Sequence, residues 1–82
     1  MNMTYINNFE IQGVASYLRE EDGVSKFLIN TERIDGDDMR KAAVVSCECA
    51  PGLSLKDGQV VHVVGFFSGY GLWVNCFLKV EK

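Results

Sequence analysis

The sequence predicts an all-β domain, a five-stranded Greek-key barrel with a short crossover turn between the third and fourth strands. Three tight-turn signals separate runs of apolar, β-branched or aromatic residues: Asp22-Gly23, Asp35-Gly36 and Ser68-Gly69-Tyr70-Gly71. One longer connection, at 50–58, separates the third run from the fourth. A meander of three strands, a crossover and a final hairpin give the connectivity of such a barrel.

The first strand is expected at about 8–19, with Phe9, Ile11 and Ala15 facing the core. Gly13 interrupts this run, and a glycine inside a strand is typical of a bend or bulge where a barrel closes. The alternation beyond that point is not determined, so the orientation of Tyr17 and Leu18 stays open.

The second and third strands are expected at about 24–33 and 40–49, joined by the Asp35-Gly36 turn. Strict alternation places one set of side chains of the second strand in the core and the other set outside. The inward set of the two strands is Phe27, Ile29, Thr31, Ala43, Val45, Cys47 and Cys49, and the outward set of the second strand is Lys26, Leu28, Asn30 and Glu32.

The fourth and fifth strands are expected at about 59–67 and 72–80. Alternation predicts an inward set of Val61, Val63, Gly65, Phe67, Leu72, Val74, Cys76, Leu78 and Val80. It predicts an outward set of Val60, His62, Val64, Phe66, Trp73, Asn75, Phe77 and Lys79. The crossover, which contains Leu53 and Leu55, is too short for a full helix, and at most a helical turn is expected there to cap the open end of the barrel.

Length and composition are those of one small cytoplasmic domain spanning 1–82, with 1–7 as a flexible lead. No run approaches the ~20 consecutive apolar residues of a membrane span, and the N-terminus lacks the pattern of a signal peptide. Three cysteines form no even disulfide framework, which agrees with a reducing compartment. The net charge of −3 counts against nucleic-acid binding, although the placement of charge matters more than its sum.

Catalytic and metal sites find little support. Cys47, Cys49, Cys76 and His62 are suitable zinc ligands, but alternation puts the thiols in the core and His62 on the opposite face. The acidic residues cluster in turns, without the ligand spacing of a calcium loop. We therefore expect a protein that is not an enzyme and needs no metal or cofactor.

The outward face of the last hairpin is unusually apolar. Val60, Val64, Phe66, Trp73 and Phe77 surround His62, with Tyr70 at the turn. Such a face needs a covering, and two coverings remain open. Bases of a single strand would stack on the rings. Alternatively, a second subunit would bury the patch, since aromatic residues anchor protein interfaces.

Four of the eight basic residues lie on the second and third strands, whereas these aromatic rings lie on the last hairpin. Arg33, Arg40 and Lys41 flank the second hairpin, with Lys26 farther down the same sheet, whereas Lys79 is the cation of the last strand. These charges either hold phosphates or simply offset the acidic residues across the hairpin, and the two interpretations carry similar weight. The last hairpin then favours a subunit interface, and the second and third strands favour a nucleic-acid surface.

Three stretches resemble the bacterial and phage single-stranded DNA-binding proteins with an OB-fold, including primosomal replication protein B. They are Phe9-Glu10-Ile11-Gln12-Gly13, Lys26-Phe27-Leu28-Ile29 and Leu55-Lys56-Asp57-Gly58-Gln59-Val60-Val61-His62-Val63-Val64-Gly65. The resemblance implies an OB-like barrel that oligomerises through sheet surfaces. It also implies single-strand binding, with site residues at Lys26, Leu28, Arg33, Arg40, Lys41, Tyr70 and Trp73. Lys79, the cation of the last strand, is added to these site residues on its position alone.

The function hypothesis is thus a non-catalytic, oligomeric protein that binds single-stranded nucleic acid, DNA rather than RNA, with low sequence preference. The subunit interface in this hypothesis is Val60, His62, Val64, Phe66 and Phe77. The alternative is a small acidic protein-interaction module, an adaptor or inhibitor, that docks its last hairpin onto a larger protein partner.

Overall fold

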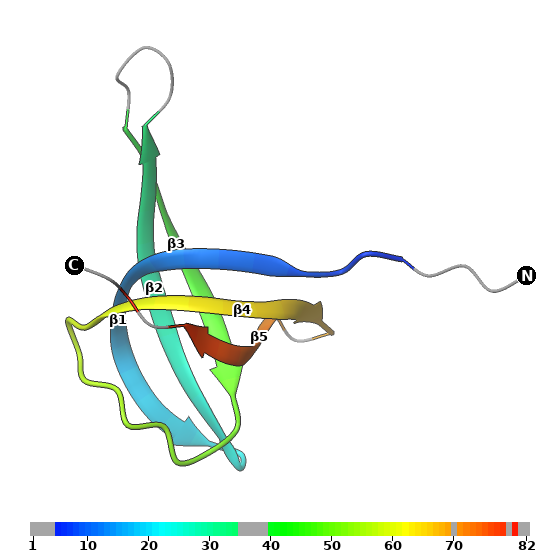
Figure 1. Ribbon diagram of the computed structural model, residues 1–82. Coiled ribbons are helices and arrows are strands. Elements are labelled where there is room, and N and C mark those ends of the chain that lie inside the picture. Colours follow the sequence, from blue (N-terminus) through cyan, green and yellow to red (C-terminus); the bar gives the residue numbers. More distant parts are fainter. Residues whose placement is uncertain (1–4, 35–39, 70, 79, 81–82) are drawn as a thin grey trace, which may run out of the picture.

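The computed structural model describes residues 5–34, 40–69, 71–78 and 80, and within them five strands form a closed barrel (Figure 1). The strands are β1 (Phe9–Glu21), β2 (Val24–Ile34), β3 (Arg40–Cys49), β4 (Val60–Ser68) and β5 (Gly71–Leu78). Their order around the barrel is β1-β2-β3-β5-β4. The predicted all-β Greek-key barrel and its crossover between the third and fourth strands are confirmed.

The crossover at 50–59 carries the chain from the end of β3 to the start of β4 without a helix. β4 then pairs antiparallel with β1, and β5 fits between β4 and β3, running parallel to β3. The helical turn that the sequence allowed in this crossover does not form, but Leu53 and Leu55 pack against the core.

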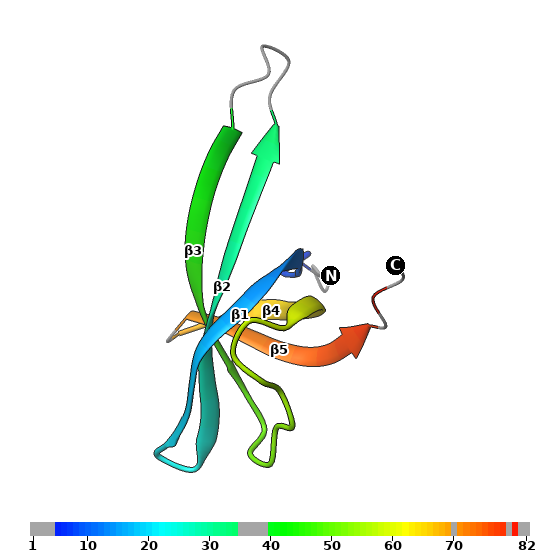
Figure 2. The ribbon, with the colours of Figure 1, turned by 90° about the vertical axis from the view of Figure 1, so that its left-hand side faces the viewer.

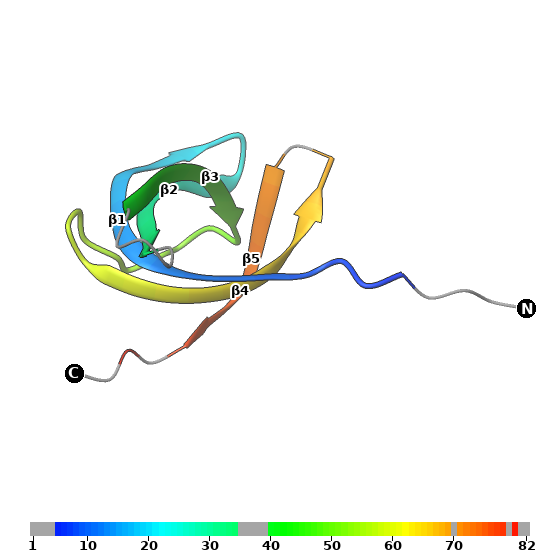
Figure 3. The same cartoon turned by 90° about the horizontal axis from the view of Figure 1, so that it is seen from above.

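The ribbon of β2 and β3 continues well beyond the barrel, as Figure 2 shows. Its last pairs are Arg33 with Lys41 and Ile34 with Arg40. We call residues 31–34 and 40–43 the arm. Residues 5–8, which precede β1, leave the barrel in another direction, which is clearest from above (Figure 3).

Among the described residues, nine apolar side chains form the buried core, and alternation predicted all nine of them to face inward. They are Ala15, Phe27, Ile29, Cys47, Cys49, Val61, Val63, Leu72 and Val74. Gly65 belongs to the same core wall, because a Cβ at this position would overlap the backbone carbonyl of Trp73 and lie 2.8 Å from the Phe9 ring. A glycine is therefore required where β4 and β5 come together.

A β-bulge in β5 reverses the predicted alternation near the end of the chain. Val64 pairs with Cys76 but Gly65 pairs with Val74, which leaves Asn75 as an extra residue. Cys76 is consequently exposed, although the sequence analysis expected it in the core. The bulge also turns Phe77 to the core side, opposite buried Val63, so its expected outward orientation was wrong.

Three more residues that were expected to face inward are exposed, two of them for reasons other than this bulge. Ala43 lies in the arm, beyond the core that would cover it. Phe67 lies at the end of β4, 57 % exposed, where its ring meets the edge of Phe9 at 6.0 Å. Leu78 follows the bulge and is 40 % exposed, paired with His62.

Candidate nucleic-acid interface

A row of side chains crosses the outside of the barrel from strand to strand. Arg19 of β1 pairs with Lys26 of β2, and Lys26 pairs with Glu48 of β3. Glu48 pairs with Trp73 of β5, and Trp73 pairs with Phe66 of β4. We call these five residues the outer row. Neighbouring strands lie about 4.8 Å apart, so Arg19 and Trp73 are separated by about 14 Å.

The buried neighbours of these residues explain why the row faces outward. Lys26 lies between Ser25 and Phe27, which are 3 % and 1 % exposed. Trp73 lies between Leu72 and Val74, which are buried as well. Because alternate side chains of a strand point to opposite faces, the residue between two buried ones projects from the barrel. The predicted outward orientation of Lys26, Trp73 and Phe66 is therefore confirmed.

Tyr17 lies beside one end of the outer row, at a second β-bulge. The pairing of β1 with β2 shifts between Ser16 and Arg19, and Tyr17 has a φ of 53°. This left-handed conformation is strained for an aromatic residue, and such strain persists only where the surroundings enforce it. The Tyr17 side chain is 61 % exposed.

The crossover supplies the contacts that hold this bulge. The Ala15 N–H donates to the Gln59 carbonyl at 2.9 Å, and the Gly58 N–H donates to the Ala15 carbonyl at 2.8 Å. On the other side, the Leu18 N–H donates to the Asp57 carboxylate at 3.4 Å. The residues before and after Tyr17 are thus both tied to the same loop, which enforces the strained conformation.

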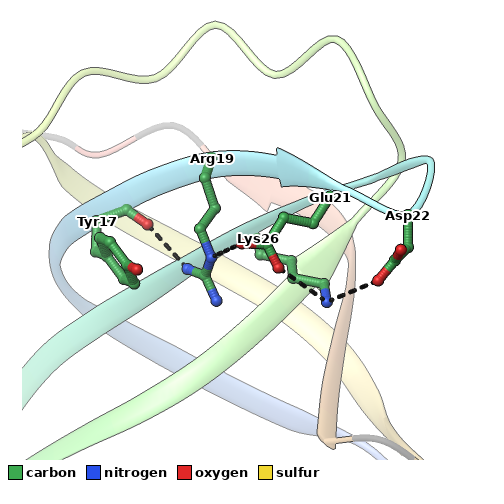
Figure 4. A network of polar contacts seen from close by, with 5 residues as sticks. All are labelled: Tyr17, Arg19, Glu21, Asp22 and Lys26. Atoms are coloured by element: carbon green, nitrogen blue, oxygen red, sulfur yellow. Dashed lines mark hydrogen bonds and ion pairs between the residues drawn. The ribbon is translucent and has the colours of Figure 1, made fainter.

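Arg19 completes a cation–aromatic pair with Tyr17 (Figure 4). Its guanidinium lies 4.3 Å from the centre of the Tyr17 ring, and its Nη1 donates to the Tyr17 carbonyl at 3.1 Å. The guanidinium therefore fixes both the ring and the backbone of the bulge. The guanidinium covers one face of the ring, and the ring, 61 % exposed, keeps accessible surface on which a base can stack beside a cation.

Acidic side chains neutralise the cations at this end of the row. Glu21 accepts from Arg19 Nε at 2.9 Å and lies 3.6 Å from Lys26 Nζ, and Asp22 lies 3.7 Å from the same ammonium group (Figure 4). Two cations thus face two carboxylates. Exposed ion pairs contribute only about 0–1 kcal/mol each, so a phosphate group can replace these carboxylates.

Leu28 and Val44 extend the outer surface along β2 and β3. Leu28 is half-buried between Ser16 and Ser46, and Val44 is 61 % exposed opposite Asn30. Their small polar neighbours leave these apolar groups accessible. They lie on the same outer face of the barrel as Lys26.

The other predicted cations are not close to Lys26. Arg33 lies seven residues beyond it on β2, at about 23 Å for an extended strand. Arg40 and Lys41 stand opposite Ile34 and Arg33 in the backbone register, so all three cations belong to the arm. The side chains of Arg40 and Lys41 are outside the described part, as are residues Tyr70 and Lys79.

The predicted interface residues of β4 do share one outer face, with one change in membership. Val60 and Phe66 are 45 % and 38 % exposed, Val64 is half-buried, and the His62 imidazole contacts the Glu10 carboxylate. Because of the bulge in β5, Cys76 and Leu78 stand opposite Val64 and His62. They take the place expected for Phe77, which lies on the core side.

The four residues that were considered as zinc ligands lie on opposite faces of the sheet. Cys47 and Cys49 are buried in the core, whereas His62 and Cys76 are on the outer face. Burial raises the pKa of the Cys47 thiol to about 12, with a further contribution from nearby Cys49, whose own pKa burial also raises. Among the described residues, no three His, Cys, Asp or Glu side chains form a metal-binding group.

No helix of the described chain is long and apolar enough to cross a membrane.

Sequence reasoning missed Tyr17 and Arg19 as site residues. The apolar pattern of β1 did contain a sign of the bulge. The side chains that face the core belong to odd-numbered residues as far as Ala15, but the next one belongs to the even-numbered Leu18. Such a change requires one extra residue and therefore a bulge. It did not show that Tyr17 would carry the strain.

No family model matches this chain, and no curated protein matches its sequence. A solved structure, described as a small single-stranded DNA-binding protein from Mycoplasma pneumoniae, superimposes with a TM-score of 0.70. The match covers 92 % of this chain and 88 % of that chain, at 10 % sequence identity. The chain has the OB fold. At this identity the likeness extends to the fold alone, and the predicted fold is confirmed.

Proposed function

We propose that this protein binds single-stranded DNA with low sequence preference, across Arg19, Lys26 and Trp73 of the outer row and the Tyr17 ring. The observation that carries the proposal is that Tyr17, next to Arg19, and Trp73 lie on either side of Lys26 along one row of outward side chains. The similar solved structure, described as a single-stranded DNA-binding protein, supports DNA as the ligand. The proposed activity is binding without catalysis, in the cytoplasm.

The proposed path of the DNA runs across the strands rather than along them. One base stacks on Tyr17 and another on Trp73, while Arg19 and Lys26 hold phosphates between them. Stacking accepts every base, and each stacked base contributes about 1–3 kcal/mol. A path of this kind therefore gives affinity without strong sequence preference.

Further contacts belong to the same proposal. Leu28 offers an apolar contact next to Lys26, and Arg33, Arg40 and Lys41 give the arm a group of cations that a longer strand would reach. Tyr70 and Lys79 remain site residues on the sequence prediction alone. The net charge of −3 opposes DNA at long range, so we expect a modest affinity with a clear dependence on salt.

Self-association is the second part of the proposal. The outer face of β4 and β5 exposes Val60, Phe66 and Leu78, together with half-buried Val64, around the His62–Glu10 pair. A second copy of the chain would cover this apolar surface. The alternative function assigns the same surface to a larger protein partner, and the charge of −3 suits a basic one.

The proposed DNA binding is tested by fluorescence anisotropy with a labelled oligothymidylate at about 50 and about 200 mM salt. Two to three phosphate contacts predict an affinity that falls about tenfold over this range. A duplex of the same length is the control and should bind more weakly. Absence of binding at micromolar protein and low salt would contradict the proposal.

Sedimentation velocity tests the proposed self-association. Phe66→Ser should shift the protein toward the monomer, because it places a hydroxyl in the apolar surface. Val44→Ser, an exposed apolar residue on β3, is the matched control and should leave the oligomer intact. An oligomer that persists in Phe66→Ser would exclude this surface.

A further inference from the structure

We propose that Arg19 and Lys26 form a phosphate subsite, and that the Glu21 carboxylate occupies this subsite in the unliganded protein. The inference rests on the proposed DNA binding and adds a specific position for one phosphate group. It also assigns Glu21 a role, as an internal competitor of that phosphate.

The geometry of Glu21 is that of a bridging anion (Figure 4). Its Oε1 lies 2.9 Å from Arg19 Nε, and its Oε2 lies 3.6 Å from Lys26 Nζ. Each oxygen of one anion therefore contacts a different cation. Two non-bridging oxygens of a phosphodiester present the same arrangement, and both groups accept charge-assisted hydrogen bonds from Arg and Lys.

The two cations have donor capacity left for a phosphate. Arg19 has five N–H donors, and its described hydrogen bonds use Nε toward Glu21 and Nη1 toward the Tyr17 carbonyl. Lys26 reaches its two carboxylates only at 3.6 and 3.7 Å, which are ion-pair distances without tight hydrogen bonds. Neither cation is therefore fully satisfied by its protein partners.

The Tyr17 ring provides a surface on which a DNA base can stack next to the phosphate subsite. The strained φ of 53° places the ring under the Arg19 guanidinium, 4.3 Å from its centre. A base stacked on the exposed ring would bring its own phosphate beside Arg19. The subsite is therefore one nucleotide unit, with the base on Tyr17 and the phosphate between Arg19 and Lys26.

The turn after β1 keeps Glu21 in this position. Asp22 and Gly23 have φ values of 55° and 79°, so the tight turn returns the chain directly into β2. Glu21 then pairs with Val24, two residues before Lys26. The Glu21 side chain is 49 % exposed, so water screens its ion pairs and a stronger anion can displace it. Glu21 thus weakens DNA binding without preventing it.

The test measures oligothymidylate affinity by anisotropy at low salt for Glu21→Gln and Glu20→Gln. Both variants remove one negative charge from the end of β1, but the described partners of the Glu20 carboxylate are the Gly52 N–H and the Ser25 hydroxyl. We expect Glu21→Gln to bind about 3- to 10-fold more tightly than the unmodified protein. Glu20→Gln should change the affinity less than about 2-fold, because glutamine keeps the acceptor oxygen and its exposed charge is screened by water and salt.

A coupling measurement separates the subsite from a general charge effect. In an Arg19→Gln, Lys26→Gln background, Glu21→Gln should no longer increase the affinity. If the unmodified protein binds but Glu21→Gln gains no more affinity than Glu20→Gln, or gains equally in that background, the inference is wrong and DNA binding stands. If the unmodified protein does not bind at all, the proposed function itself fails.

Discussion

The ring of Phe77 lies 6.1 Å from the ring of Phe27, centre to centre, with an angle of 36° between the ring planes. Phe27 is 1 % exposed at the centre of the core, whereas Phe77 is 38 % exposed near the end of β5. The pair closes the barrel where the crossover provides no helix. Uninterrupted alternation would put Phe77 outside, and the extra residue Asn75 brings it in.

Phe77→Ala is expected to lower the free energy of unfolding by about 2–3 kcal/mol, less than for a fully buried phenylalanine. Phe67→Ala is the matched control, since Phe67 is 57 % exposed and meets only the edge of Phe9. Urea denaturation measures both variants. Equal losses would mean that Phe77 is not part of the core.

Gly65→Ala is expected to destabilise the barrel by about 3 kcal/mol or more, because the added Cβ would overlap the Trp73 carbonyl. Gly69→Ala adds the same methyl group where no heavy atom lies within 4 Å. The control should change the free energy of unfolding by less than about 0.5 kcal/mol. Thermal unfolding of the two variants decides whether β4 and β5 pack as closely as described.

The thiols are expected to differ in reactivity. Cys76 is exposed, whereas Cys47 and Cys49 are buried with raised pKa values and hold little thiolate at neutral pH. Iodoacetamide should modify Cys76 alone in the folded protein and all three thiols in urea. Peptide mass spectrometry identifies the modified residues, and modification of Cys47 in the native state would show that the core is open.

The same burial makes stability depend on alkaline pH. The pKa of Cys47 is about 12 in the folded protein against 9.0 for the free thiol. The unfolded chain therefore loses its proton first, and stability should fall as the pH rises from about 9 toward 12. Urea unfolding at several pH values measures this fall, which should be smaller in Cys47→Ala. An identical fall in both proteins would point to other groups.

Tyr17→Gly is expected to separate stability from binding. Glycine accepts the φ of 53° without strain, so the free energy of unfolding should stay within about 1 kcal/mol of the unmodified value. The affinity for oligothymidylate should fall about tenfold through the loss of stacking. Tyr17→Phe keeps the ring and is the control. A stable Tyr17→Gly protein that binds as well as the control would exclude the ring from the site.

The alternation of apolar and polar side chains was sufficient to predict the barrel, its core and the outward side chains of β2. It was sufficient because, over most of each strand, successive side chains point to opposite faces without interruption. It failed at Cys76 and Phe77, where one inserted residue reverses every position that follows. It left Tyr17 open for the same reason. The bulge of β1 contains no glycine that marks it, whereas the bulge of β5 lies opposite Gly65 of β4. The contacts that fix the bulge of β1 come from Asp57, Gly58 and Gln59, far along the chain.

The candidate site was predictable in part. Lys26 and Trp73 were recognised as outward, and their register confirms that they lie in one row. The distance between Lys26 and the arm depends on how far β2 and β3 extend beyond the barrel, which side-chain patterning does not encode. The ion pairs of Glu21 depend on the turn geometry after β1.

The most direct test of the account follows the amide signals of ¹⁵N-labelled protein during titration with an oligothymidylate. We predict that the largest shifts fall on Tyr17, Arg19, Lys26 and Trp73, and that they decrease as salt is added. Shifts confined to β4 around Val60 and His62, or no shifts at low salt, would contradict the proposed DNA-binding surface.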